Sequence, residues 1–130
     1  MARRRSISAP QLPRPFGFDR LERLPLADVV AALGTPHLAR AALWRLIAAG
    51  PVAIPHVKHG LRSSDAAVRR GCCEFLDLYP DDDSVDALVA LLSDSDADVR
   101  WMAAHALTCE RCKTDTWIKR QQRLSGTPAP

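Results

Sequence analysis

The sequence predicts an all-α protein built as an α-solenoid of about three helical hairpins. Small or apolar residues recur at helical spacing in three stretches, which start at Leu38, Val68 and Val99 and are offset by 30 and 31 residues. Aromatic residues make up only 5% of the chain, so the core must be aliphatic and rich in alanine. Such a composition suits closely packed helices better than a sheet.

The second and third stretches share a longer motif. One copy reads Asp-Ala-Ala-Val-Arg from Asp65, and the other reads Asp-Ala-Asp-Val-Arg from Asp96. In each copy, small or apolar residues follow the valine at +4, +5 and +8, as they follow Leu38 in the first stretch. A repeat of this period builds an extended surface instead of an enclosed pocket, so it favours a binding scaffold over a self-contained enzyme.

The first hairpin is predicted from two helices separated by a short turn. The first helix covers residues 26–33 and stops at Gly34. Thr35 then offers an N-cap, with proline at the first helical position. The second helix is expected over residues 36–49, because Gly50-Pro51 ends it.

The second hairpin is predicted to begin at Pro55. Its second helix is capped by Ser64 or Asp65 and ends before Tyr79-Pro80, because a residue that precedes proline disfavours the helical conformation. The residues expected to face inward are Ile54, Val57, Leu61, Val68, Cys72 and Leu76.

The third hairpin follows the acidic run 81–83, which places negative charge at a helix start, where the helix dipole favours it. The last helix is expected to begin at Asp96 or Asp98 and to reach about Lys113. The predicted buried stripe of the preceding helix is Val85, Leu88, Val89 and Leu92.

Charge and composition divide the chain into three predicted segments. Residues 1–24 form a basic, Arg- and Pro-rich arm that is expected to be flexible, residues 25–113 form the repeat domain, and residues 114–130 form a basic tail with a possible capping helix and a disordered end. The arm has a net charge of +4, whereas residues 25–112 have a net charge of −4. The repeat body is therefore not expected to bind nucleic acid.

Export and membrane signals are missing from the sequence. The basic start Arg3-Arg4-Arg5 is not followed by an uninterrupted apolar stretch, and no segment approaches the length of a membrane span. We therefore expect a cytoplasmic protein whose four cysteines are thiols.

The motifs resemble the HEAT-repeat family, and in particular its short bacterial form related to phycobilin-lyase repeats. The signature of that form, Asp-x-x-Val-Arg-x-x-Ala-Ala-x-Ala-Leu, is matched best by residues 96–107, while the copy from Asp65 departs at Gly71, Cys72 and Cys73. The resemblance covers about residues 26–112. It implies an α-solenoid, and it implies that Arg69 and Arg100 bond an aspartate of a neighbouring repeat turn.

Candidate functional residues lie along one row of the last predicted helix. Trp101, His105, Cys109 and Cys112 turn away from the core, and Trp101 occupies a position that is arginine in the preceding repeat. We predict that this row faces a partner or the chain's own tail, without a metal or other cofactor. The alternative is a Zn²⁺ site of His105, Cys109 and Cys112, with a fourth ligand from elsewhere.

The sequence contains no recognisable enzyme motif: it lacks a glycine-rich phosphate loop, a nucleophile elbow and a His-Glu-x-x-His pair. We therefore predict a non-enzymatic protein-interaction scaffold that binds another protein and that is a possible homo-oligomer. Two alternatives stay open: an adaptor that binds nucleic acid through the basic arm and tail, and a lyase-like module in which Cys109 or Cys112 touches a ligand.

Overall fold

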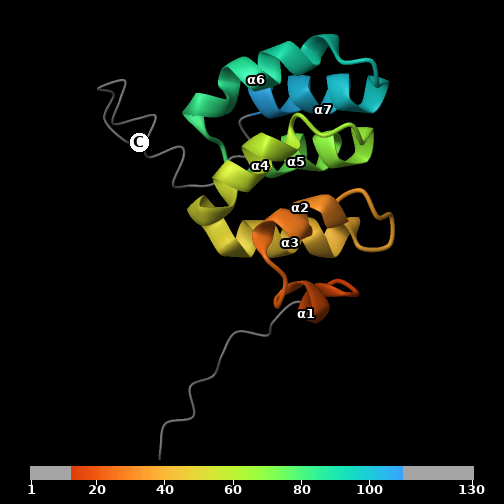
Figure 1. Ribbon diagram of the computed structural model, residues 1–130. Helices are drawn as coiled ribbons and strands as arrows, with labels where there is room; N and C mark the ends of the chain where they lie inside the picture. The colour runs from red at the N-terminus through yellow and green to blue at the C-terminus, as the bar shows by residue number, and fades with distance from the viewer. Residues whose placement is uncertain (1–12, 110–130) are drawn as a thin grey trace, which may run out of the picture.

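The computed structural model describes residues 13–109, and within that range the chain is helical and contains no strand. Six helices pair into three hairpins that stack in chain order (Figure 1). The pairs are α2 (Leu26–Ala32) with α3 (Ala39–Ala49), α4 (Ile54–Gly60) with α5 (Ala66–Leu78), and α6 (Val85–Ala90) with α7 (Ala97–Thr108). The predicted fold, an α-solenoid of three helical hairpins, is confirmed.

Short 3₁₀ turns complete the hairpins. They cover Gly50–Ala53, Asp82–Ser84 and Leu91–Ser93, and each adjoins one or two of the α-helices. The first of these turns begins at Gly50, whose φ of 70° lies in the left-handed region that favours glycine. This conformation ends α3 where the sequence predicted.

A further short helix, α1 (Phe18–Leu21), packs against α3 below the first hairpin (Figure 1). Phe18 and Leu21 are both buried and belong to the hydrophobic core. Arg14 lies over the Phe18 ring and bridges Asp19 and Glu22. The core therefore begins earlier in the chain than residue 25, the predicted start of the repeat domain. Residues 1–12 and 110–130, which include half of the predicted arm and the whole tail, lie outside the described range.

Side-chain caps fix the starts of the two longest motif helices. The Asp65 carboxylate accepts a hydrogen bond from the Ala67 N–H at 2.9 Å, and the Asp96 carboxylate accepts one from the Val99 N–H at 3.0 Å. Each bond satisfies a backbone donor that has no partner within its helix. The repeated aspartate of the motif is therefore a helix cap.

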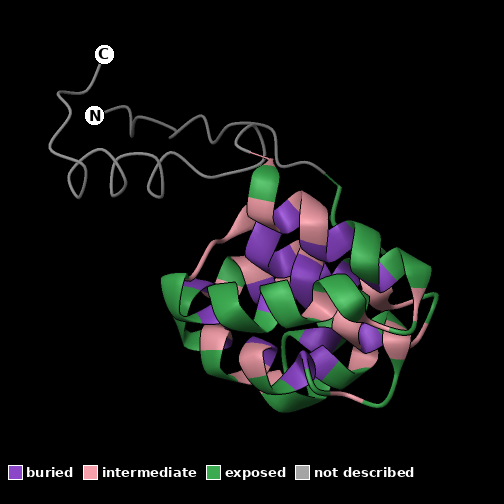
Figure 2. Ribbon diagram, turned by 90° about the horizontal axis from the view of Figure 1, so that it is seen from above, coloured by how far each residue is buried: buried purple, intermediate pink, exposed green. Residues whose placement is uncertain are grey.

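The core lies between the two helices of each hairpin and between successive hairpins (Figure 2). The inward residues predicted for α5, namely Val68, Cys72 and Leu76, are buried, as are Val57 and Leu61 of the preceding helix. Small residues allow this close packing. A Cβ atom added to Gly60 would lie only 2.5 Å from Cys72 Sγ and 2.6 Å from Val30 Cγ1, so α4 passes close to both α2 and α5.

The predicted buried stripe of α6 is wrong for all but one of its members. Leu88 is 4% exposed, whereas Val85, Val89 and Leu92 are 41–49% exposed. Leu61 is the residue of the preceding repeat that corresponds to Leu92. It is 4% exposed because the third hairpin follows it. Helical periodicity located the apolar stripe correctly, but burial of that stripe requires a neighbour, and no described residues follow the third hairpin to provide one.

Two predicted helix boundaries also need correction. α3 begins at Ala39 instead of Pro36, because residues 35–38 close a turn in which the Leu38 N–H donates to the Thr35 carbonyl. α7 ends at Thr108, and Cys109 adopts an extended backbone, so the helix does not continue to Lys113 as predicted. The predicted helical row therefore stops before Cys112, which lies outside the described residues.

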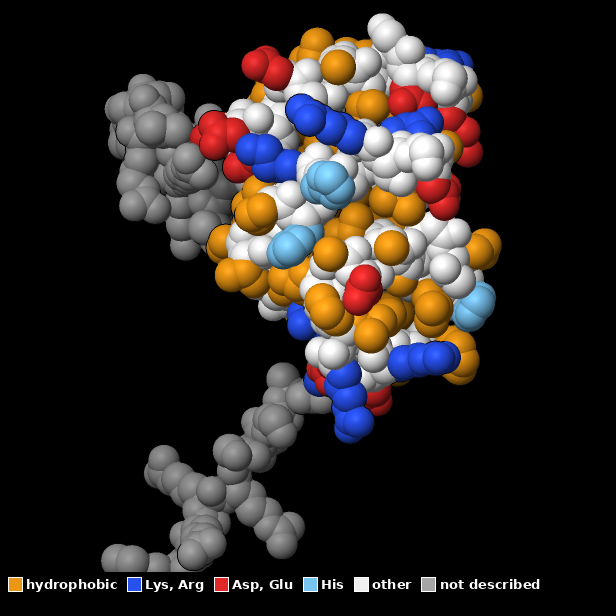
Figure 3. All heavy atoms as spheres, in the orientation of Figure 1, with side chains coloured by type: hydrophobic (Ala, Val, Ile, Leu, Met, Phe, Trp, Pro, Cys, Tyr) orange, Lys and Arg blue, Asp and Glu red, His pale blue; other side chains and the backbone are white. Residues whose placement is uncertain are grey.

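The face made by α2, α4 and α6 combines apolar side chains with histidine, basic and acidic ones (Figure 3). His56 and His59 belong to this face, and His59 is exposed, in line with a solvated position. Among the described residues, no helix has the length and apolar character that crossing a membrane would require.

Candidate functional site

The α7 helix presents Trp101 and His105 one turn apart. Trp101 is 63% exposed, and its indole stacks on the His105 imidazole with ring centroids 5.1 Å apart and planes inclined by 10°. The i, i+4 spacing on a helix brings the two rings together. The predicted outward orientation of this row is thus observed for Trp101, while the indole partly covers His105.

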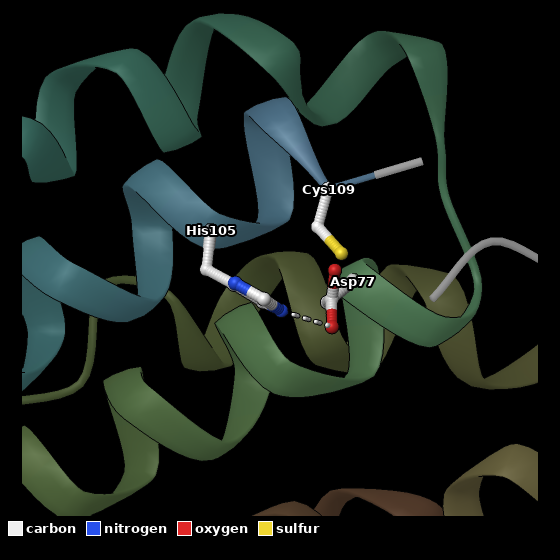
Figure 4. A group of neighbouring side chains, drawn as sticks. All are labelled: Asp77, His105 and Cys109. Carbon is white, nitrogen blue, oxygen red and sulfur yellow. Dashed lines mark ion pairs between the residues drawn. The ribbon is translucent and has the colours of Figure 1, made fainter. Parts of the chain in front are cut away.

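Asp77 contributes a carboxylate to the same place from the end of α5. Its side chain is only 5% exposed, and its Oδ2 lies 3.4 Å from His105 Nε2. Cys109 follows α7 directly, and its backbone N–H donates to the His105 carbonyl at 2.8 Å. Figure 4 shows that the His105 imidazole and the Cys109 thiol both point toward the Asp77 carboxylate. We call Asp77, His105 and Cys109 the end cluster.

The potential ligand atoms of the end cluster, one from each residue, all lie within 4.8 Å of one another. The His105 imidazole and the Cys109 thiol both converge on the Asp77 carboxylate (Figure 4). A nucleophile–base–acid relay would instead place the imidazole between the thiol and the carboxylate, so that the base could take the proton from sulfur. The arrangement is therefore suited to holding a cation or a proton between its members, and not to nucleophilic catalysis.

The sequence analysis identified His105 and Cys109 but did not identify Asp77. One signal was available: Asp77 occupies the repeat position that is Ile47 in the first hairpin, 30 residues earlier. A carboxylate at a buried repeat position requires a specific partner, since burying an unpaired charge is costly. That partner cannot be read from periodicity alone.

The arginine contacts confirm the ladder that the resemblance implied for Arg69. Its guanidinium donates to both carboxylate oxygens of Asp94 at 2.9 Å each and to the Ser63 carbonyl at 2.9 Å. This geometry raises the pKa of Arg69 and lowers that of Asp94, in each case chiefly through the hydrogen bond between them. Arg100 repeats only the backbone contact, donating to the Asp94 carbonyl at 2.7 Å.

The adjacent cysteines of α5 have no place in an accessible site. Cys72 and Cys73 are free thiols with no measurable exposure. Desolvation raises the pKa of each thiol to about 12. Because only the thiolate reacts readily, both side chains are inert packing groups.

A second candidate surface runs along α3, α5 and α7, the second helices of the hairpins; we call it the outer face. The first two of these helices and the start of the third line a groove of about 670 Å³. Its polar and aromatic lining residues include Arg40, Trp44, Arg70, Glu74, Asp96 and Asp98. Trp44 is half-buried.

The outer face has a repeating arrangement of side chains. Arg40, Arg70 and Trp101 occupy the same position of successive repeats, and all three are exposed. Trp44, Glu74 and His105 occupy the position four residues later, and these are intermediate in exposure. The outer face therefore presents one column of fully exposed side chains beside a partly covered column.

Stacked helical hairpins, with aspartate caps on α5 and α7 and arginine–aspartate contacts between repeats, define the chain as an α-solenoid repeat protein. The family model described as HEAT repeats matches residues 54–116, which include the second and third hairpins. The second and third hairpins thus match HEAT repeats, and the first hairpin, which precedes the matched range, shares the same helical arrangement. Searches of curated proteins and of solved structures found no match to the chain.

Proposed function

We propose that this chain is a non-enzymatic scaffold that binds another protein through its outer face. The observation that carries the proposal is the exposure of Trp101. An indole that is 63% exposed on a helix otherwise packed on its neighbours represents apolar area that association would bury. Tryptophan and arginine are the residues most enriched among those that dominate binding energy at protein interfaces.

The family supports the general form of this proposal, because HEAT repeats serve in general as protein-interaction modules. The groove lined by α3, α5 and the start of α7 supports the location of the binding site. Exposed arginines at Arg40 and Arg70 and the half-buried Trp44 offer charge-assisted hydrogen bonds next to apolar contact area. A partner segment with carboxylates beside apolar side chains fits this chemistry.

Site-specific photo-crosslinking in the organism that encodes the protein would test the proposal. A photoreactive phenylalanine analogue replaces Arg70 in one variant and Trp101 in another, and replaces the exposed Asp86 of α6 in the control. We expect both outer-face variants to crosslink to the same protein and the Asp86 control not to. Crosslinks only to a second copy of this chain would replace the proposal with self-assembly.

Binding to the purified partner then provides the quantitative test. We expect Trp101→Ala to weaken the affinity roughly 30-fold, which corresponds to about 2 kcal/mol at an interface hot spot. Val89→Ala removes a half-exposed apolar side chain from α6 and serves as the control, with an expected change below about twofold. Equal effects of the two substitutions would contradict a binding site on the outer face.

A further inference from the structure

We propose that the end cluster is a Zn²⁺ site in which Asp77, His105 and Cys109 bind the ion. The structure adds Asp77, a ligand from α5 that the sequence did not identify. A metal site at this place differs from the sequence-based expectation of a row without metal. The three described residues offer one oxygen, one nitrogen and one sulfur ligand. Zinc accepts all three kinds of ligand in tetrahedral sites.

The distance between the His105 and Asp77 ligand atoms matches a tetrahedral site. Two ligand atoms at about 2.1 Å from Zn²⁺ and at the tetrahedral angle lie about 3.4 Å from each other. The distance from His105 Nε2 to Asp77 Oδ2 is 3.4 Å. All three ligand atoms lie within 4.8 Å of one another, which is close enough for one ion to lie among them.

The burial of Asp77 is a second, independent observation. Its side chain is 5% exposed, at a repeat position occupied by isoleucine in the first hairpin. A carboxylate there is desolvated, and a bound divalent cation would offset that cost. The stacked indole of Trp101 fixes the His105 ring from its other side, as orienting contacts commonly do for metal ligands.

The local backbone places the Cys109 thiol at the end of α7. α7 ends at Thr108, and Cys109 has φ −81° and ψ 106°, so the chain leaves the helix at the residue that provides the thiol. Cys112 follows Cys109 by three residues in the sequence but lies outside the described residues, so no ligand role is assigned to it. The carboxylate comes from α5, so the ion would join the second hairpin to the end of the third.

Zinc is favoured over other cations by the ligand set. Mg²⁺ and Ca²⁺ prefer oxygen ligands, of which the end cluster offers a single carboxylate. Mixed thiolate and imidazole ligands are typical of Zn²⁺ in structural sites. The site would thus have a structural role at the end of the described solenoid.

The metal itself is the probe that tests the proposal. Full-length chain, purified without chelator and with reductant, is expected to contain close to one zinc per chain by elemental analysis. After removal of zinc, Co²⁺ should bind with the visible bands of a tetrahedral ion and a thiolate-to-metal charge-transfer band. Iron or copper in place of zinc, or Co²⁺ spectra without the charge-transfer band, would overturn the assignment.

Ligand variants with matched controls locate the site. His105→Ala, Asp77→Asn and Cys109→Ser should each weaken Co²⁺ binding more than about 100-fold, since even supporting residues around metal sites contribute 10–100-fold. The controls His59→Ala and Glu74→Gln replace an exposed histidine on α4 and the acidic residue nearest to Asp77 along α5, and should bind as the unaltered chain does. Unchanged binding in any one ligand variant would remove that residue from the site.

Folding is monitored separately, so that loss of structure is not mistaken for loss of a ligand. Zn²⁺ should raise the Tm of the unaltered chain and of both controls, and should leave the Tm of Cys109→Ser unchanged. If Asp77→Asn does not fold, Cys109→Ser still tests the metal site. Cys109 is partly exposed, so its substitution should leave the fold intact. A Tm that is insensitive to Zn²⁺ in the unaltered chain would reduce the end cluster to a His105–Asp77 ion pair.

Discussion

At the scale of single residues, Arg69 joins the second hairpin to the third. Its side chain is 13% exposed and that of Asp94 is 9% exposed, so their bidentate ion pair is largely screened from water. Removing one member of such a pair leaves the other charge buried without its partner. The contact therefore matters more to stability than a surface ion pair would.

We expect Arg69→Ala to lower the free energy of unfolding by about 3 kcal/mol. The neighbouring Arg70→Ala is the matched control: Arg70 is exposed, and its loss should change the free energy by less than about 0.5 kcal/mol. Urea denaturation followed by circular dichroism measures both. Equal and small losses would mean that the bridge contributes no more than a solvated pair.

The same ion pair predicts a pH dependence. The hydrogen bond from Arg69 lowers the pKa of Asp94 below its usual value of 3.8, so the unfolded state binds this proton more readily than the folded state does. The contribution of Asp94 is therefore fully present above the unfolded pKa and is lost as the pH falls through the lower, folded pKa.

Comparison of the unaltered chain with Asp94→Asn isolates this contribution. The difference between their free energies of unfolding should be largest at pH 6 and should shrink steadily as the pH falls below about 4. Urea titrations at several pH values provide the measurement. A difference that does not change with pH would show that the Asp94 carboxylate is not the linked group.

At the scale of elements, Gly60 determines how closely α4 approaches its neighbours. A Cβ at this position would lie 2.5 Å from Cys72 Sγ and 2.6 Å from Val30 Cγ1, well inside ordinary contact distance. Alanine has a higher helix propensity than glycine, by about 1 kcal/mol. Overpacking a close contact of this kind typically costs 1–3 kcal/mol.

Gly60→Ala is therefore expected to destabilise the protein by about 1 kcal/mol despite the gain in propensity. Ala67→Gly, at an exposed position of α5, gives the propensity effect alone and should also cost about 1 kcal/mol. Thermal denaturation of both variants compares them. Stabilisation by Gly60→Ala would contradict the close packing of α4 against α2 and α5.

The elements also indicate how far sequence reasoning extends. The hairpins, the caps at Asp65 and Asp96, and the inward face of α5 follow from short-range chemistry, and periodicity and capping residues were enough to predict them. The exposure of Val85 and Val89 did not follow, because a helix face is buried only where another element covers it. Pattern alone does not say which faces are covered.

The end cluster was predictable only in part, for a related reason. His105 and Cys109 share a row that helical spacing places together, and the sequence identified them. Asp77 comes from the preceding hairpin and reaches the cluster through the packing of α5 on α7. The distance between repeats in space, and not the spacing in sequence, determines that contact.

At the scale of the whole molecule, the three hairpins contribute unequally to the core. α5 buries six residues and packs between α3 and α7, whereas α6 buries only Leu88. In a repeat protein, stability is approximately a sum over repeats and the contacts between neighbours. The terminal hairpins should therefore open more readily than the middle one.

Hydrogen–deuterium exchange read by mass spectrometry tests this unequal distribution. Amides of α5 are expected to exchange slowest, and those of α6 should exchange faster than those of α4, whose Val57 and Leu61 are buried. Arg69→Ala should speed exchange in α6 and α7 while leaving α2 and α3 nearly unchanged, because the Arg69–Asp94 bridge joins only the second and third hairpins. Arg70→Ala again provides the control and should leave the pattern as it is. If α6 of the unaltered chain is protected as strongly as α5, something in solution covers Val85, Val89 and Leu92. If the Arg69→Ala substitution speeds exchange in all six hairpin helices, the hairpins unfold as one unit.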